Sequence, residues 1–311
     1  MSGSSVLNLS NQCLNIGFQK IASSVFLAYA TPIRTAVNAT MQAMVSAETN
    51  PTYPTSWTTL IDSYNGTNLY TTLETVSTNA ASLITEANAL AQVYTLGNQA
   101  TITAQGDDNL LYHLNRSNLA FNQLADSVQD LMVVFGYSLV QNNDTKDTGD
   151  WLLGSQTSSP TSIVNLAAGD QEILLQLAAN LSVAFNNIAN SVNTQVNSVP
   201  SWSLAGLSGI QVYLSYVAQQ ATEQSSYSTT LESTSQRQRE SLAISAFVVM
   251  PSQYDEYLAA QTALFQSMYL SGEYFQDIYE GIHDATIFGT SPTPGSTPTG
   301  TPDLTPTLTS N

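Results

Sequence analysis

Apolar residues recur along two long segments of this sequence with alternating spacings of four and three. Such spacing, held over several turns, places one narrow apolar stripe along a helix, which suits side-by-side packing of long helices. The first stripe consists of Leu69, Leu73, Val76, Ala80, Leu83, Ala87, Leu90 and Tyr94. The second consists of Leu110, Leu114, Phe121, Leu124, Val128, Leu131 and Phe135, with Ser117 at the one polar position. The pattern predicts an all-α protein, a bundle of long antiparallel helices with heptad-like packing of the coiled-coil type.

These two stripes belong to expected helices over 67–96 and 107–140, and four further helical segments flank them. The first covers 5–47, where we expect Pro32 to kink or end the helix, because proline removes a backbone hydrogen bond and clashes with the preceding turn. The others start near 170, 210 and 252. The third of these four segments carries polar residues at stripe positions, which predicts that it is exposed there or contacts other polar groups. Those residues are Gln224, Ser228, Ser235 and Gln238.

The chain divides into a helical part and a tail. Residues 1–288 are expected to form the elongated bundle, interrupted by an irregular central loop at about 141–169 that is rich in Asn, Asp, Thr, Ser and Gly. Residues 289–311 are a Pro/Thr/Ser-rich segment, a composition that cannot build a packed core and favours an extended chain. We therefore predict a disordered, flexible C-terminal tail.

Charged residues are rare and mostly acidic. They make up only 9% of the 311 residues, against roughly 25% in an ordinary soluble domain. Six basic and 23 acidic residues give a formal net charge of −17. Binding to nucleic acid or to anionic lipid head groups needs clustered lysine and arginine, so the sequence speaks against both.

A surface of neutral polar residues loses little charge when the pH falls and offers few sites to trypsin-like proteases. Both properties suit the outside of a particle or cell, although biased amino-acid usage in the source lineage would give the same composition. The N-terminus lacks the basic and apolar regions of a signal peptide. The longest apolar run, 242–250, is too short for a resident membrane span.

Catalytic and metal-binding patterns are scarce. Glu280 and His283 match the Glu-x-x-His spacing of di-iron bundles, but Leu110 stands where His113 would need a second glutamate. Cys13 is the only cysteine, so no intramolecular disulfide and no thiolate cluster is expected. The sequence predicts no cofactor and no metal. A Ser/His/Asp triad is set by geometry rather than by spacing, so the sequence leaves that alternative open.

Three groups of residues stand out as candidate surfaces. Tyrosines crowd the last segment and suit a partly wet interface or the edge of the core, namely Tyr254, Tyr257, Tyr269, Tyr274 and Tyr279. An acidic ridge expected to raise the pKa of its histidine consists of Glu273, Asp277, Glu280, His283 and Asp284. A short apolar insert contains Trp202, Leu204, Leu207 and Ile210.

Two functions from different classes fit these features. The first is a non-enzymatic structural or interaction protein on the outside of a particle or cell, such as a virion component, which associates with itself or with other structural proteins. The alternative is a water-soluble α-helical pore-forming protein that rearranges on membranes, with 201–210 as its inserted segment. That segment is shorter and more polar than a pore-forming hairpin needs.

Overall fold

The structure of the protein, a computed structural model, describes residues 3–48, 69–93, 104–140, 168–198, 208–245 and 251–288. These residues are almost entirely α-helical, and no strand occurs among them. The helices are α1 (Gly3–Glu48), α3 (Leu69–Gln92), α4 (Ala104–Val140), α6 (Ala168–Asn197), α7 (Ser208–Ser245) and α8 (Pro251–Phe288). The all-α prediction is confirmed. The tail 289–311 and nearly all of the central loop 141–169 lie outside the described residues.

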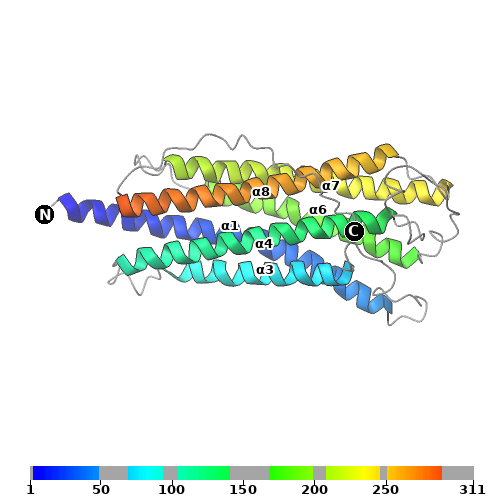
Figure 1. Ribbon diagram of the computed structural model, residues 1–311, viewed down its shortest axis with the longest axis horizontal. Coiled ribbons are helices and arrows are strands. Elements are labelled where there is room, and N and C mark those ends of the chain that lie inside the picture. The colour runs from blue at the N-terminus through cyan, green and yellow to red at the C-terminus, as the bar shows by residue number, and fades with distance from the viewer. Residues whose placement is uncertain are drawn as a thin grey trace, which may run out of the picture.

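The six described helices form a closed ring in cross-section. The order of packing is α1, α3, α4, α8, α7 and α6, and α6 packs in turn against α1. Figure 1 shows that the helices lie along one long axis and that each runs opposite to its two neighbours in the ring. Helix α4 also touches α1, α6 and α7 across the ring, so side chains fill the middle of the bundle.

Side-chain contacts confirm the antiparallel pairing. Between α3 and α4, Asn79 meets Gln123 and Glu86 meets Arg116, so residue numbers rise along one helix as they fall along the other. Between α7 and α8, Gln224 meets Ser271, while Arg237, further along α7, meets Glu256.

The two apolar stripes predicted from the sequence are buried wherever they are described. The seven stripe residues of α3 from Leu69 to Leu90 have no exposed surface, and the seven apolar ones of α4 are at most 1% exposed. Ser117, the polar position in the second stripe, is also fully buried. Tyr94 lies outside the described residues. The 4-3 spacing thus identified which side of each helix faces the core.

The first helix does not end at Pro32, in contrast to one of the two expected outcomes. Helix α1 continues through Pro32 to Glu48. A proline inside a helix costs about 3 kcal/mol. Burial on both sides of Pro32 offsets this cost, because Tyr29, Ala30 and Ile33 have no exposed surface. The hydrophobic effect therefore outweighs the local preference of proline.

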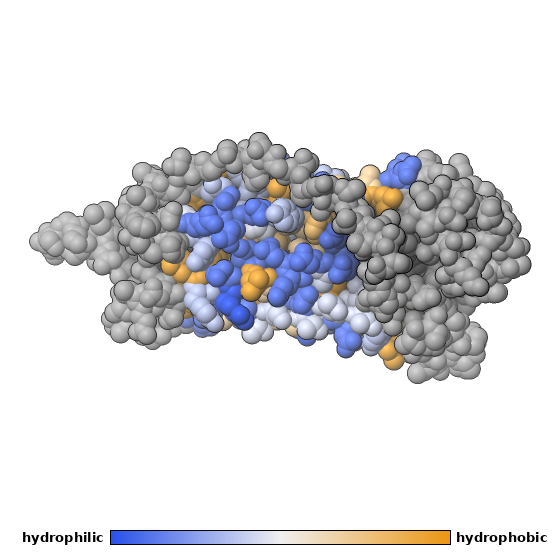
Figure 2. Space-filling view, in the orientation of Figure 1, coloured by the Kyte–Doolittle hydropathy of each residue, from blue (hydrophilic) through white to orange (hydrophobic). Residues whose placement is uncertain are grey.

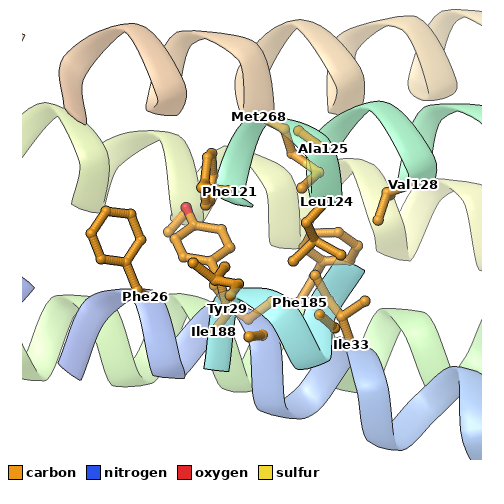
Figure 3. Packing of buried hydrophobic residues seen from close by; sticks show 14 of the residues in the cluster. Phe26, Tyr29, Ile33, Phe121, Leu124, Ala125, Val128, Phe185, Ile188 and Met268 are labelled. Carbon is orange, nitrogen blue, oxygen red and sulfur yellow. The ribbon is translucent and has the colours of Figure 1, made fainter. Parts of the chain in front are cut away.

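Aromatic side chains from opposite sides of the ring meet at its centre. The ring centroids of Phe26 in α1 and Phe275 in α8 are 4.4 Å apart. Phe121 of α4 lies 5.1 Å from Phe275 and 5.0 Å from Tyr29, in both cases edge to face. Figure 3 shows Phe26, Tyr29 and Phe121 gathered between the helices. These rings connect α1, α4 and α8 across the middle of the bundle.

Polar side chains occupy the interior between α7 and α8. Gln224 of α7 donates a hydrogen bond from Nε2 to Ser271 Oγ of α8 at 3.1 Å, and the Tyr29 hydroxyl lies 3.5 Å from the same oxygen. Burial raises the pKa of Tyr29 to about 12, although the hydrogen bonds to Ser271 and Gln224 act in the opposite direction. Tyr29 is therefore neutral at physiological pH, and all three groups can share a dry site.

The other polar stripe residues of α7 are buried as well. Ser228 donates to the Ser225 carbonyl and Ser235 to the Leu231 carbonyl, both within α7. Such local bonds satisfy a buried hydroxyl without a partner helix. Of the two outcomes expected for these positions, contact with polar groups is confirmed for Gln224, Ser228 and Ser235. The side chain of Gln238 lies outside the described residues.

Candidate interaction surface

Three tyrosine rings form a cluster where α7 and α8 lie side by side, in tilted and edge-to-face arrangements. The rings of Tyr216 in α7 and Tyr274 in α8 are 5.1 Å apart, and Tyr213 lies 6.4 Å from each of them. Tyr213 and Tyr274 are buried, whereas Tyr216 is 37% exposed. In this tyrosine cluster, the two buried rings therefore join α7 to α8, and the ring of Tyr216 faces the surface.

Two carboxylates lie near this tyrosine cluster. Burial raises the pKa of the Tyr274 phenol, and the neighbouring Tyr216 raises it further. The negative charges of Asp277 and Glu223 also contribute to this increase, so both carboxylates lie near the Tyr274 ring. Glu223 accepts a hydrogen bond from Gln219 Nε2 at 3.2 Å. The tyrosine cluster thus has one carboxylate of α7 and one of α8 nearby.

The carboxylates of α8 influence one another. Partial burial raises the pKa of Asp277, and the charges of Glu280 and Glu273 raise it further. A hydrogen bond to Glu273 raises the pKa of the Tyr269 phenol, which is 44% exposed. Glu280 accepts a hydrogen bond from Gln276, which in turn accepts one from Asn118 of α4. These interactions link the carboxylates and tyrosines of α8 with one another and, through Tyr274, with α7.

We call this surface the acidic–tyrosine face. It consists of Tyr216, Glu223, Tyr269, Glu273, Tyr274, Asp277 and Glu280. Helices α8 and α6 contain no lysine or arginine. Arg237 of α7 pairs with Glu256 and lies about 21 Å along the helix from Glu223, and Arg116 of α4 pairs with Glu86 of α3. The described arginines of the neighbouring helices therefore do not neutralise this face.

The side of the bundle on which α8 and α4 lie in front is predominantly hydrophilic where it is described. Figure 2 shows hydrophobic residues there as separate spots rather than as one continuous area. Single exposed apolar residues are ordinary on a protein surface. Recognition on this side would therefore depend on charge, hydrogen bonding and aromatic rings.

The tyrosines predicted as one interface have different positions in α8. Tyr257 is fully buried and donates a hydrogen bond to the Met132 carbonyl of α4 at 2.7 Å, so it belongs to the core. Tyr274 is buried in the tyrosine cluster, Tyr279 is partly buried against the core, and Tyr269 is exposed. The side chain of Tyr254 lies outside the described residues. Of the four predicted tyrosines whose side chains the structure describes, Tyr269 alone is exposed.

The other two predicted groups are described in part. Glu273, Asp277 and Glu280 share a side of α8, as their spacing predicted, whereas the side chains of His283 and Asp284 lie outside the described residues. Ile210 is buried in the first turn of α7. Trp202, Leu204 and Leu207 precede that helix and lie outside the described residues.

The sequence analysis missed the residues that α7 contributes to the face. Tyr213 and Tyr216 are three residues apart and Glu223 follows seven residues after Tyr216, so the spacing places them near one another on a helix. That signal was present in the sequence. These residues could be assigned to the face only once the fold showed that α7 packs against α8.

The described residues offer neither a metal site nor a membrane span. No group of three or more His, Cys, Asp or Glu side chains is arranged there to hold a metal ion. His113 Nδ1 lies 3.8 Å from Glu86 Oε2, on the same carboxylate that binds Arg116. None of the described helices combines the length and apolarity of a membrane span.

Comparison of the chain with models of known protein families, with curated proteins and with solved structures found no match in any of the three.

Proposed function

We propose that this protein is a non-enzymatic structural or interaction protein exposed on the outside of a particle or cell, as a virion component or surface assembly protein. It associates with further copies of itself or with other structural proteins. The observation that carries the proposal is the acidic–tyrosine face, where exposed Tyr216 and Tyr269 lie among carboxylates that no described arginine nearby neutralises. Tyrosine is enriched at protein interfaces, because its ring buries apolar area while its hydroxyl remains hydrogen-bonded.

The remaining parts of the proposal come from the sequence. The long helices pack in the heptad-like manner of coiled coils, and the ring gives them the rigidity that an assembly unit needs. The Pro/Thr/Ser segment 289–311 is a flexible tail that extends from the bundle. The scarcity of charge and of trypsin sites suits a protein that faces the outside medium.

Light scattering on a sizing column, with negative-stain microscopy of the peak fractions, tests the assembly part of this proposal. We expect regular multimers in the absence of lipid. An elongated monomer at pH 4 and at pH 7 would contradict self-association, and leakage of dye from liposomes would then favour the pore-forming alternative. Labelling of intact particles or cells with an antibody against the bundle tests the location. Labelling that requires permeabilisation would contradict an exterior position.

A further inference from the structure

The outer side of α1 carries two basic residues at heptad spacing. Lys20 and Arg34 are exposed, and Leu27, which is partly buried against the core, lies midway between them, seven residues from each. None of the ion pairs among the described residues involves Lys20 or Arg34. We call Lys20, Leu27 and Arg34 the α1 stripe. It is the one described surface where two basic side chains without an ion pair share a helix.

The α1 stripe and the acidic–tyrosine face lie on opposite sides of the molecule. In the closed ring, α8 is three positions away from α1 in either direction, and α7 is next to α8. A surface on α1 and a complementary surface on α7 and α8 cannot meet within one chain. They can meet between two copies placed side by side.

One end of the α1 stripe lies level with one end of the acidic–tyrosine face. Phe26 and Phe275 mark a common level, because their rings are 4.4 Å apart. Lys20 lies six residues before Phe26, and Glu280 lies five residues after Phe275 on a helix of opposite direction. At 1.5 Å per residue these displacements are about 9 and about 7.5 Å toward the same end. Lys20 and Glu280 therefore lie at nearly the same height.

At the other end, Arg34 of the α1 stripe and Glu223 of the acidic–tyrosine face differ more in height along the bundle axis. Tyr29, Ser271 and Gln224 meet in the interior and mark a second level. Glu223 directly precedes Gln224, and Arg34 lies five residues beyond Tyr29 on a helix that runs in the same direction as α7. Arg34 and Glu223 are thus about 9 Å apart along the axis. The extended side chains of an arginine and a glutamate bridge this separation.

We infer that the acidic–tyrosine face binds the α1 stripe of a second copy of this chain, displaced sideways without a large shift along the axis. Lys20 then faces Glu280, and Arg34 faces Glu223. Leu27 packs near Tyr216 and Tyr274, which lie between the two charged positions. This inference rests on the proposed function and specifies the contact through which copies associate.

The chemistry of the two surfaces favours the α1 stripe of a second copy as the binding partner of the acidic–tyrosine face. A basic side chain gains from nearby carboxylates and from the face of an exposed tyrosine ring. Contact of an acidic–tyrosine face with another such face would instead bring like charges together. Because the two contacting surfaces differ, the interface is heterologous and each copy can bind one neighbour on either side. The arrangement repeats into a row or closes into a ring of copies.

Exchange of the charges tests this contact with the full chain. One variant carries Lys20→Glu and Arg34→Glu, so that both of its surfaces are acidic. A second carries Glu223→Lys and Glu280→Lys, so that a lysine stands at each of the two positions that face Arg34 and Lys20. A control carries Glu74→Lys and Asp126→Lys, which make the same charge change as the second variant at exposed positions of α3 and α4. Far-ultraviolet circular dichroism and thermal melting establish that each variant folds.

We expect the wild type and the control to assemble alike, and each charge-exchanged variant alone to have a dissociation constant at least about tenfold higher, equivalent to 1.4 kcal/mol. An equimolar mixture of the two variants should regain assemblies, because the introduced glutamates of one variant then face the introduced lysines of the other, and the two unchanged surfaces can also meet. Raising the salt concentration should weaken all of these assemblies.

Two results would overturn the inference, and they differ in what they say about the proposed function. If both variants assemble as well as the wild type, the protein self-associates through another surface, and the proposed function stands without this contact. If the folded wild type remains monomeric at all concentrations, both the contact and self-association are wrong.

Discussion

Helices α3 and α4 pair through apolar side chains, whereas α7 and α8 pair through a mixture of apolar and polar ones. In the first pair every described stripe position except Ser117 is hydrophobic. In the second, Gln220, Gln224, Ser267 and Ser271 are buried, and Ser267 and Gln224 donate hydrogen bonds to the opposite helix. Both pairs are long, antiparallel and part of the same ring.

The difference shows two ways of fixing helices against each other. Apolar burial provides most of the stability, but it depends weakly on the axial position of one helix relative to the other. A hydrogen bond such as that from Gln224 to Ser271 forms only in one relative position, and leaving its groups unpaired costs free energy. We therefore assign stability mainly to the α3–α4 pair and axial positioning mainly to the α7–α8 pair.

The largest effect is expected from a charge in the apolar pair. Leu124→Asp places an unpaired carboxylate where the native side chain has no exposed surface, and it should destabilise the fold by more than about 3 kcal/mol. Leu83→Asp in α3 should act in the same way. Urea unfolding followed by circular dichroism measures both.

Leu119→Asp is the matched control, because Leu119 is 52% exposed on the same helix as Leu124, and its cost should stay below about 1 kcal/mol. Equal melting temperatures for the wild type and Leu124→Asp would show that the stripe assignment is wrong.

An intermediate effect is expected from the polar pair. Ser271→Ala removes the oxygen that Gln224 Nε2 and the Tyr29 hydroxyl share, and it leaves both buried groups without this partner. The expected loss is about 1–3 kcal/mol in the free energy of unfolding. Ser226→Ala, at an exposed position of α7, should change little. If Ser271→Ala is as stable as the wild type, the buried hydrogen bonds do not hold α8 in place.

The smallest effect is expected from the titration of carboxylates whose pKa the fold raises. Burial raises the pKa values of Asp126, Asp130 and Asp277 above the ordinary value of 3.8. Between that value and the raised pKa, the folded state binds more protons than the unfolded state, so stability increases as the pH falls from 7 through this window. We expect a higher melting temperature in mild acid than at pH 7. Asp277→Asn should raise the melting temperature at pH 7 and reduce the pH dependence. A fall in melting temperature on mild acidification would contradict this account.

The sequence predicted the apolar pair better than the polar one. The stripes of α3 and α4 could be assigned because apolar periodicity with at most one polar interruption, Ser117, has one structural meaning, burial of that side. Gln224 and Ser235 interrupt the stripe of α7, and periodicity alone could not decide between exposure and burial. Their burial depends on partners that lie on other helices or one turn back in α7, such as Ser271 and the Leu231 carbonyl.

The candidate surface was predictable only in the part that belongs to one helix. Glu273, Asp277 and Glu280 follow helical spacing, so their common side on α8 could be inferred. Glu223 and Tyr216 come from α7, and their proximity to Tyr274 follows from the order of helices around the ring. Tyr257 was predicted as an interface residue but belongs to the core. Its burial against α4 could not be inferred from the tyrosine content of α8.

Formation of a disulfide between copies tests the central claim, assembly through opposite sides of the ring, most directly. In a Cys13→Ala background, Lys20→Cys and Glu280→Cys place one thiol on the outer side of α1 and one on that of α8, where they cannot meet within a chain. On mild oxidation we expect a ladder of covalent multimers on a non-reducing gel. The control pairs Glu280→Cys with Thr85→Cys, an exposed position of α3, and should give no ladder. A ladder absent from the first pair, or equally strong in both, would contradict the account.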